Sequence, residues 1–191
     1  MTRLVGREYM NNGQENTSDS YVIRPQVLRN EIMFQGQSLA PGQRKRTQKA
    51  LRALHSLEIM AVNIYRFQLN RQQTLLNQEL IAAMCNEATH TQDFLVKLYE
   101  YGMRPSKFRW FWWLVGMAFG LISRFLGPKA MLKTGVWTEN KAVAHYTELL
   151  TLDWDPATRA VIEKDLADEQ KHINTWKHLL ETGWKKNDKI E

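Results

Sequence analysis

Four stretches of the chain repeat apolar residues at helical spacing, and each carries one glutamate inside its apolar stripe. The stretches begin near residues 43, 74, 129 and 156. Their glutamates are Glu58, Glu87, Glu139 and Glu169. A carboxylate buried in an apolar core is costly unless a cation neutralises it. The pattern therefore predicts a helical bundle whose interior holds a cation site.

Two of these glutamates are followed by a histidine three residues later. The pairs are Glu87 with His90 and Glu169 with His172. Residues three apart share one face of a helix, so one helix can present an oxygen and a nitrogen together. Glu58 and Glu87 are 29 residues apart, and Glu139 and Glu169 are 30 apart. The chain reads as two helix pairs, each contributing Glu and then Glu-x-x-His.

Two Glu helices combined with two Glu-x-x-His helices form the ligand set of dinuclear carboxylate bundles. Mixed oxygen and imidazole ligands suit iron or manganese. We expect Glu87 and Glu169 to bridge two metal ions. The first ion is completed by Glu58 and His90, and the second by Glu139 and His172.

Polar residues beside the shared glutamates are candidate outer partners of the two histidines. Asp168 directly precedes Glu169 and is expected to hold the His90 ring. Asn86 has the matching position before Glu87 and is expected to serve His172. Three further acids face solvent or support the ligands from outside: Asp93, Glu100 and Asp165.

A short apolar segment, "RWFWWLVGMAFGLIS", separates the two helix pairs. Fourteen uncharged residues lie between Arg109 and Arg124, whereas a membrane-spanning helix needs about 20. We expect a helix over about 107–126 that lies in a membrane interface, or one that is buried in the fold or between copies. The expected headgroup-level side chains are Trp110, Trp112 and Trp113. The cations expected to attract anionic lipids are Arg44, Lys45, Arg46, Lys49 and Arg52.

The net charge of +6 suits an anionic partner, but no nucleic-acid-binding motif accompanies it. The single cysteine, Cys85, excludes an intramolecular disulfide and a cysteine-based metal site. The expected organisation is an extended N-terminal arm over 1–42, a bundle over 43–182 and a polar tail over 183–191. The N-terminal stretch lacks an apolar signal core and contains acidic residues, which argues against a mitochondrial presequence.

Several stretches between about residues 50 and 180 resemble one enzyme family. They are "EIMAVNIY", "NEATHTQDF", "YGMRPS", "LVGMAFGLISRFLGPKAM", "ENKAVAHYTELL" and "ADEQKH". The sequence resembles the demethoxyubiquinone monooxygenases of ubiquinone biosynthesis. The resemblance implies an all-α, ferritin-like four-helix bundle with an additional short apolar membrane-interfacial helix. It also implies two iron ions, with manganese less favoured.

The implied reaction is hydroxylation of a ring carbon of a demethoxyubiquinone-type polyprenyl quinone with O2, with NADH as reductant. His145 and Tyr146 are expected to position or relay a proton near the second metal. The family's small glycines beside the first glutamate are replaced by Leu57 and Met60, which are expected to narrow the pocket or alter the substrate.

The implied location is peripheral, on the cytoplasmic face of a bacterial inner membrane or the matrix face of the mitochondrial inner membrane. Other ubiquinone-biosynthesis proteins are the implied partners. Two other functions stay open from the residues alone. One is a ferritin-like protein that handles iron or reduces peroxide. The other is a non-enzymatic bundle that binds a quinone or lipid.

Overall fold

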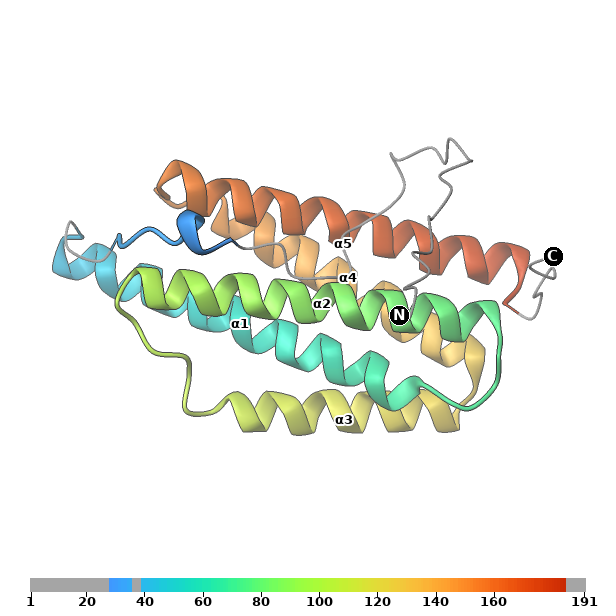
Figure 1. Cartoon of the computed structure of the whole chain (residues 1–191). Coiled ribbons are helices and arrows are strands. Elements are labelled where there is room, and N and C mark those ends of the chain that lie inside the picture. The colour runs from blue at the N-terminus through green and yellow to red at the C-terminus, as the bar shows by residue number, and fades with distance from the viewer. Residues whose placement is uncertain (1–27, 36–38, 185–191) are drawn as a thin grey trace, which may run out of the picture.

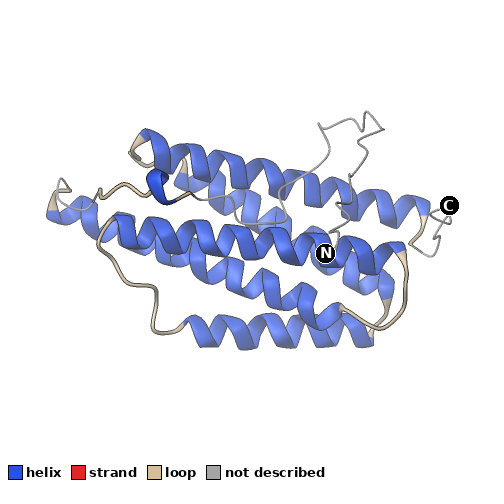
Figure 2. Ribbon diagram, in the orientation of Figure 1, coloured by secondary structure: helices blue, strands red, loops and turns tan. Residues whose placement is uncertain are grey.

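The computed structural model describes residues 28–35 and 39–184, and these form helices and no strand (Figures 1 and 2). The predicted all-α class is therefore confirmed for this part of the chain. The helices are α1 (Pro41–Gln68), α2 (Leu75–Glu100), α3 (Arg109–Phe125), α4 (Pro128–Leu149) and α5 (Pro156–Thr182), after a short 3-10 turn η1 (Arg29–Glu31). Four long helices, α1, α2, α4 and α5, form a bundle, and α3 lies along the outside of α1 (Figure 1). Most of the predicted arm (1–42) and tail (183–191) falls outside the described residues, so those boundaries stay predictions.

The helix ends follow local chemistry. The side chain of Asp155 accepts a hydrogen bond from the Thr158 amide at 3.0 Å, and Pro156 occupies the first helical position of α5. The predicted start of this helix is thus confirmed. Pro41 is the first residue of α1. Proline fits there because the first amides of a helix have no intrahelical partner.

The buried apolar residues form two clusters with a polar layer between them. One cluster includes Leu51, Leu54, Phe94, Leu98, Tyr146 and Ile162. The other includes Ile64, Tyr65, Leu80, Ala83, Leu132 and Trp176. Each of the four glutamates lies, along its own helix, between residues of the two clusters. Apolar side chains therefore close the bundle on both sides of the carboxylate layer and exclude water from it.

Two glycines one turn apart let α3 approach the backbone of α1. A Cβ atom added at Gly116 would lie 2.3 Å from the Met60 carbonyl oxygen, and one at Gly120 would lie 2.5 Å from that of Ile64. Only glycine avoids these clashes without moving a backbone. The same contact fixes which face of α3 is turned toward the bundle.

We predict that Gly116→Ala destabilises the protein by about 1–3 kcal/mol, because the new methyl group overpacks the α1–α3 contact. At an ordinary helix position the same change would stabilise by about 1 kcal/mol. Thermal unfolding measures the sign. The control is Ala118→Ser, an exposed position of α3, which should change stability by no more than about 0.5 kcal/mol. A Gly116→Ala protein that melts above the wild type would contradict the close contact.

Candidate metal centre

Six buried side chains form two overlapping groups between the helices of the bundle. The first group contains Glu58, Glu87, His90 and Glu169, and the second contains Glu87, Glu139, Glu169 and His172. Within each group the candidate ligand atoms all lie within 4.8 Å of one another. Glu87 and Glu169 belong to both groups. The structure therefore brings together all six residues that the sequence singled out. The two glutamates that belong to both groups are the two that were expected to bridge the metal ions.

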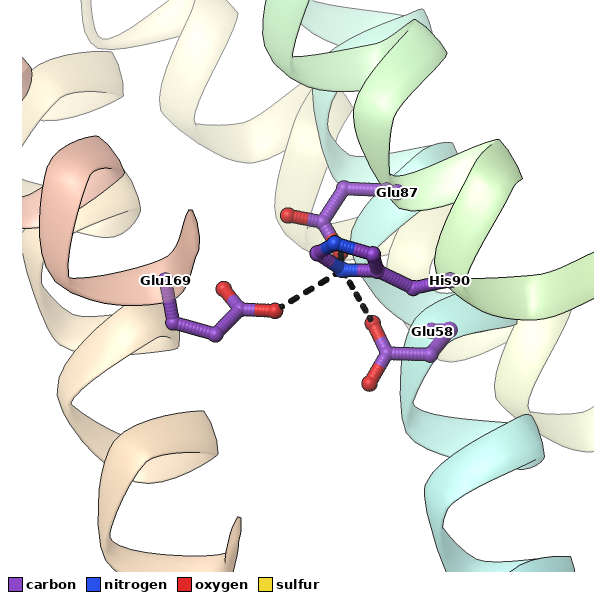
Figure 3. Close-up of side chains that lie close together, drawn as sticks. All are labelled: Glu58, Glu87, His90 and Glu169. Atoms are coloured by element: carbon purple, nitrogen blue, oxygen red, sulfur yellow. Dashed lines mark ion pairs between the residues drawn. The ribbon is translucent and has the colours of Figure 1, made fainter. Parts of the chain in front are cut away.

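Three helices supply the first group (Figure 3). Glu58 comes from α1, Glu87 and His90 come from α2, and Glu169 approaches from α5 on the opposite side. The Nδ1 atom of His90 lies 3.1 Å from Glu169 Oε1 and 3.9 Å from Glu58 Oε2. The imidazole nitrogen and the carboxylates thus converge on one small volume.

The second group repeats this arrangement on the other side of the shared glutamates. The Nδ1 atom of His172 lies 3.1 Å from Glu87 Oε1 and 3.6 Å from Glu139 Oε1. The His90 and His172 rings are 6.5 Å apart between centroids. Each histidine therefore turns its Nδ1 atom toward the shared carboxylates.

The four carboxyl groups divide into two kinds. Burial, together with the charges of the shared pair, raises the pKa of Glu58 and of Glu139 well above the ordinary value. Burial also opposes ionisation of Glu87 and Glu169, but their contacts with the two histidines outweigh it and lower their pKa. The environment therefore favours the protonated form of the outer pair and the ionised form of the shared pair.

The histidines carry the matching positive charge. Burial opposes their protonation, but the surrounding carboxylates raise the pKa of His90 well above its usual range and that of His172 to about 9. Without a metal ion, protonation of the histidines and of the outer carboxyl groups would reduce the net charge of the group.

The residues fit a pair of divalent cations. All four oxygens of Glu87 and Glu169 are buried and make no hydrogen bond within the described residues. Buried polar atoms in that state are uncommon in folded proteins. Four carboxylates also balance the charge of two divalent ions. Oxygen and imidazole donors together match the preference of iron and manganese.

Two buried tyrosines bind the outer carboxylates crosswise. The Tyr146 hydroxyl donates to Glu58 Oε1 at 2.7 Å, and the Tyr65 hydroxyl donates to Glu139 Oε1. Tyr146 was expected near the second metal, beside Glu139, but the structure turns it to the first group. Seven residues of helix rise about 10.5 Å, which carries Tyr146 past its own helix's ligand. Tyr65 was missed, although it follows Glu58 by the same seven residues.

The outer nitrogen of His90 faces two aspartates. Asp168 Oδ2 lies 3.5 Å from His90 Nε2, consistent with its predicted position, and Asp165 Oδ1 lies 3.6 Å away. Burial raises the pKa of Asp165 to about 6, and Lys164 lies 3.1 Å from its Oδ1 atom. Asp165 is fully buried beside the ligand layer and does not face solvent. Asn86 donates to Asp168 Oδ2 at 3.3 Å, and its expected role toward His172 stays a prediction.

His145 lines a cavity of about 530 Å³ and is not a member of either metal-ligand group. The cavity also contacts Ser56 and Leu57, the two residues before Glu58, and Trp112 of α3. Three cations line the same cavity: Lys45, Lys49 and Arg52. The cavity therefore lies between the α3 helix and the backbone that carries the first glutamate, and Leu57 occupies part of its wall.

The outward face of α3 is apolar, and one of the three tryptophans expected at its surface is well exposed. Trp110 is 59% exposed. Trp112 and Trp113 are half-buried, and the Trp113 ring packs edge-on against Phe67 at 5.6 Å between ring centroids. The most exposed apolar side chains near the end of α3 are Ile122, Phe125 and Leu126. None of the described helices combines the length and apolarity needed to cross a bilayer.

Residues 45–175 match the family model of the ubiquinone biosynthesis protein COQ7. The chain belongs to this family. It is 26% identical over 140 residues to a 3-demethoxyubiquinol 3-hydroxylase of Legionella pneumophila (strain Paris), a match that covers 72% of this chain and 66% of that protein. It is 31% identical over 139 residues to the protein of the same name from Paracidovorax citrulli (strain AAC00-1), covering 71% of this chain and 68% of that protein. The chain thus spans about two thirds of the length of these relatives, and the family resemblance seen in the sequence is confirmed.

We predict that the metal-free protein loses stability between pH 6.5 and 9. The pKa of His172 is raised from 6.5 to about 9, so its protonated form stabilises the fold fully below pH 6.5 and this contribution disappears as the pH rises through 9. Thermal unfolding in the presence of a chelator measures the slope. His172→Gln should flatten it, whereas His178→Gln, at an exposed position of α5, should not. An equal slope in both variants would contradict the assignment.

Proposed function

We propose that this protein is a di-iron monooxygenase that hydroxylates a ring carbon of a demethoxyubiquinone-type polyprenyl quinone with O2. The observation that carries the proposal is the pair of buried Glu/His groups with two shared glutamates, found in a member of the COQ7 family. The bundle is ferritin-like in this proposal. Its metal ligands are Glu58, Glu87, His90, Glu139, Glu169 and His172.

Two iron ions at these ligands would supply the activation of O2. The protein's own contribution is to hold the ligands in a dry layer. Tyr146 and Tyr65 each occupy one oxygen of an outer glutamate, which leaves the other oxygen for an ion. Asp168 and Asp165 orient the His90 ring from behind and increase its basicity.

The cavity beside Leu57 is the proposed place of the quinone ring. Its wall includes the residues directly before Glu58, so a ring bound there approaches the first group. Burial lowers the pKa of His145, and its buried Nε2 atom makes no hydrogen bond to any residue that the structure describes. A neutral imidazole with a vacant nitrogen can accept a proton from a quinol hydroxyl. In this proposal His145 is the proton acceptor and Tyr146 positions Glu58.

The exposed apolar face of α3 is proposed to lie in a membrane interface, where a polyprenyl tail resides. Lys45, Lys49 and Arg52 border the same side of the bundle and suit anionic headgroups. The proposed location is peripheral, on the cytoplasmic face of a bacterial inner membrane. NADH as reductant and other ubiquinone-biosynthesis proteins as partners are part of the same proposal.

We predict that the purified protein binds about two irons per chain. Supplied with O2, a reductant and demethoxyubiquinol in vesicles, it should form the hydroxylated quinol, measured by chromatography with mass detection. Glu87→Ala and Glu169→Ala should lose both iron and product, because each removes a shared ligand. Glu163→Ala, which affects only an exposed carboxylate of α5, is the matched control.

The outcomes separate the three functions. Stoichiometric iron without product would favour the iron-handling or peroxide-reducing alternative. No stoichiometric metal after iron-replete expression would favour a quinone or lipid carrier. Iron and product lost equally in Glu163→Ala would mean that the variants report on folding rather than on the ligands.

We predict that Ile122→Glu with Phe125→Glu releases the protein from anionic vesicles in a flotation assay. These side chains are 60% and 93% exposed on α3, and two charges would oppose their insertion. Ile81→Glu, at an exposed apolar position of α2, should leave binding unchanged. Retention of the double variant on vesicles would show that α3 does not contact lipid.

A further inference from the structure

The two helix pairs repeat the ligands and the tyrosine seven residues after the first glutamate, but other positions around the ligands differ. Four residues before the first glutamate, one pair has Leu54 and the other has Gly135. Four residues after the histidine, one pair has Phe94 and the other has Trp176. The repeat differs at these two positions among others, and both lie one helical turn from a candidate ligand.

Trp176 extends the hydrogen bond between Tyr65 and Glu139 into a chain. Its Nε1 atom donates to the Tyr65 hydroxyl at 3.2 Å, and that hydroxyl donates to Glu139 Oε1. The rings of Trp176 and Tyr65 pack at 5.4 Å between centroids. Because the indole donates to the hydroxyl oxygen, the single proton of the hydroxyl is directed at the glutamate.

Gly135 makes room for the indole. A Cβ atom at this position would lie 2.9 Å from both Cδ1 and Nε1 of Trp176. The donating edge of the indole therefore rests directly on the α4 backbone, one turn before Glu139. A larger residue would displace the N–H group that reaches Tyr65.

The other half of the site lacks the corresponding donor. The Phe94 ring packs against Tyr146 at 5.8 Å between centroids, but a phenyl ring has no N–H group to offer. The Tyr146 hydroxyl donates to Glu58, and this is its one hydrogen bond within the described residues. The Tyr146 oxygen can therefore still accept a hydrogen bond. No donor to that oxygen holds the O–H group in its direction toward Glu58, as Trp176 does for Tyr65.

We propose that Trp176 is a positioning residue that acts through Tyr65 to fix Glu139, whereas Glu58 is the adjustable glutamate of the site. The inference rests on the proposed metal site. The adjustable side is also the one beside the cavities, because Leu57 and Ile59, on either side of Glu58, each line one. The two metal positions are then unequal: one is held by a clamped ligand, and the other can rearrange where a substrate arrives.

Titration of the metal-free, full-length protein with Co2+, followed by visible absorption, tests the proposal without measuring turnover. The wild type should bind in two unequal steps. Trp176→Phe keeps an aromatic ring but removes the donor, and it should weaken one step about tenfold and leave the other unchanged. Tyr65→Phe should weaken the same step. Trp176→Phe should cause no further loss in the Tyr65→Phe background, because its effect passes through that hydroxyl.

Two further variants separate positioning from packing. Trp154→Phe removes another buried indole donor, which bonds the Leu149 carbonyl at 2.7 Å, and it should leave both steps unchanged. Gly135→Ala should weaken the same step as Trp176→Phe, and the double variant should match Trp176→Phe alone because the smaller ring relieves the clash.

The failures of the two proposals differ. A wild type that binds no Co2+ would overturn the proposed metal site, and with it the clamp. Binding in two steps that Trp176→Phe weakens equally, or weakens further in the Tyr65→Phe background, would overturn the clamp alone. Loss of both steps in Trp154→Phe would likewise show that the titration reports on core packing.

Discussion

The structure depends on neutralising four carboxyl groups and two imidazoles in a layer that water does not reach. Burial alone would drive these groups apart or expose them. They stay because the histidine nitrogens meet the shared glutamates at 3.1 Å and because burial favours the protonated form of the outer carboxyl groups. The helices must therefore approach one another at this level. The contacts within this layer fix how the helices are aligned, and the two apolar clusters pack on either side of it.

The same requirement explains the supporting residues. Three of the four ligand-bearing helices, α1, α4 and α5, also carry a residue that contacts a ligand of another helix. Tyr65 of α1 reaches Glu139 of α4, and Tyr146 of α4 reaches Glu58 of α1. Since both bonds cross the same pair of helices with equal spacing, α1 and α4 run antiparallel in fixed register. The positions of the ligands therefore depend on how the helices of the bundle pack.

Much of this could be predicted from the sequence, because it depends on spacing within single helices. The six candidate ligands, the helix start at Asp155 and the apolar α3 segment are of this kind. The partner of Tyr146 depends on the register between two helices, which no single helix encodes. The orientation of α3 depends on Gly116 and Gly120 meeting α1, so Trp113 packs inward against expectation. The buried position of Asp165 could not be predicted without knowing that its face of α5 packs against His90.

The division of the ligands between the two helix pairs determines what each pair could do alone. Each helix pair supplies one outer glutamate and one Glu-x-x-His, but every candidate metal group draws on both pairs. A single hairpin therefore cannot assemble either group by itself, whereas two copies of one hairpin, related by a twofold axis, can assemble both. In a single chain that contains both hairpins, the two halves can differ in sequence. Phe94 and Trp176 occupy matching positions of the two halves, and a dimer of two identical hairpins could not have a different residue at each.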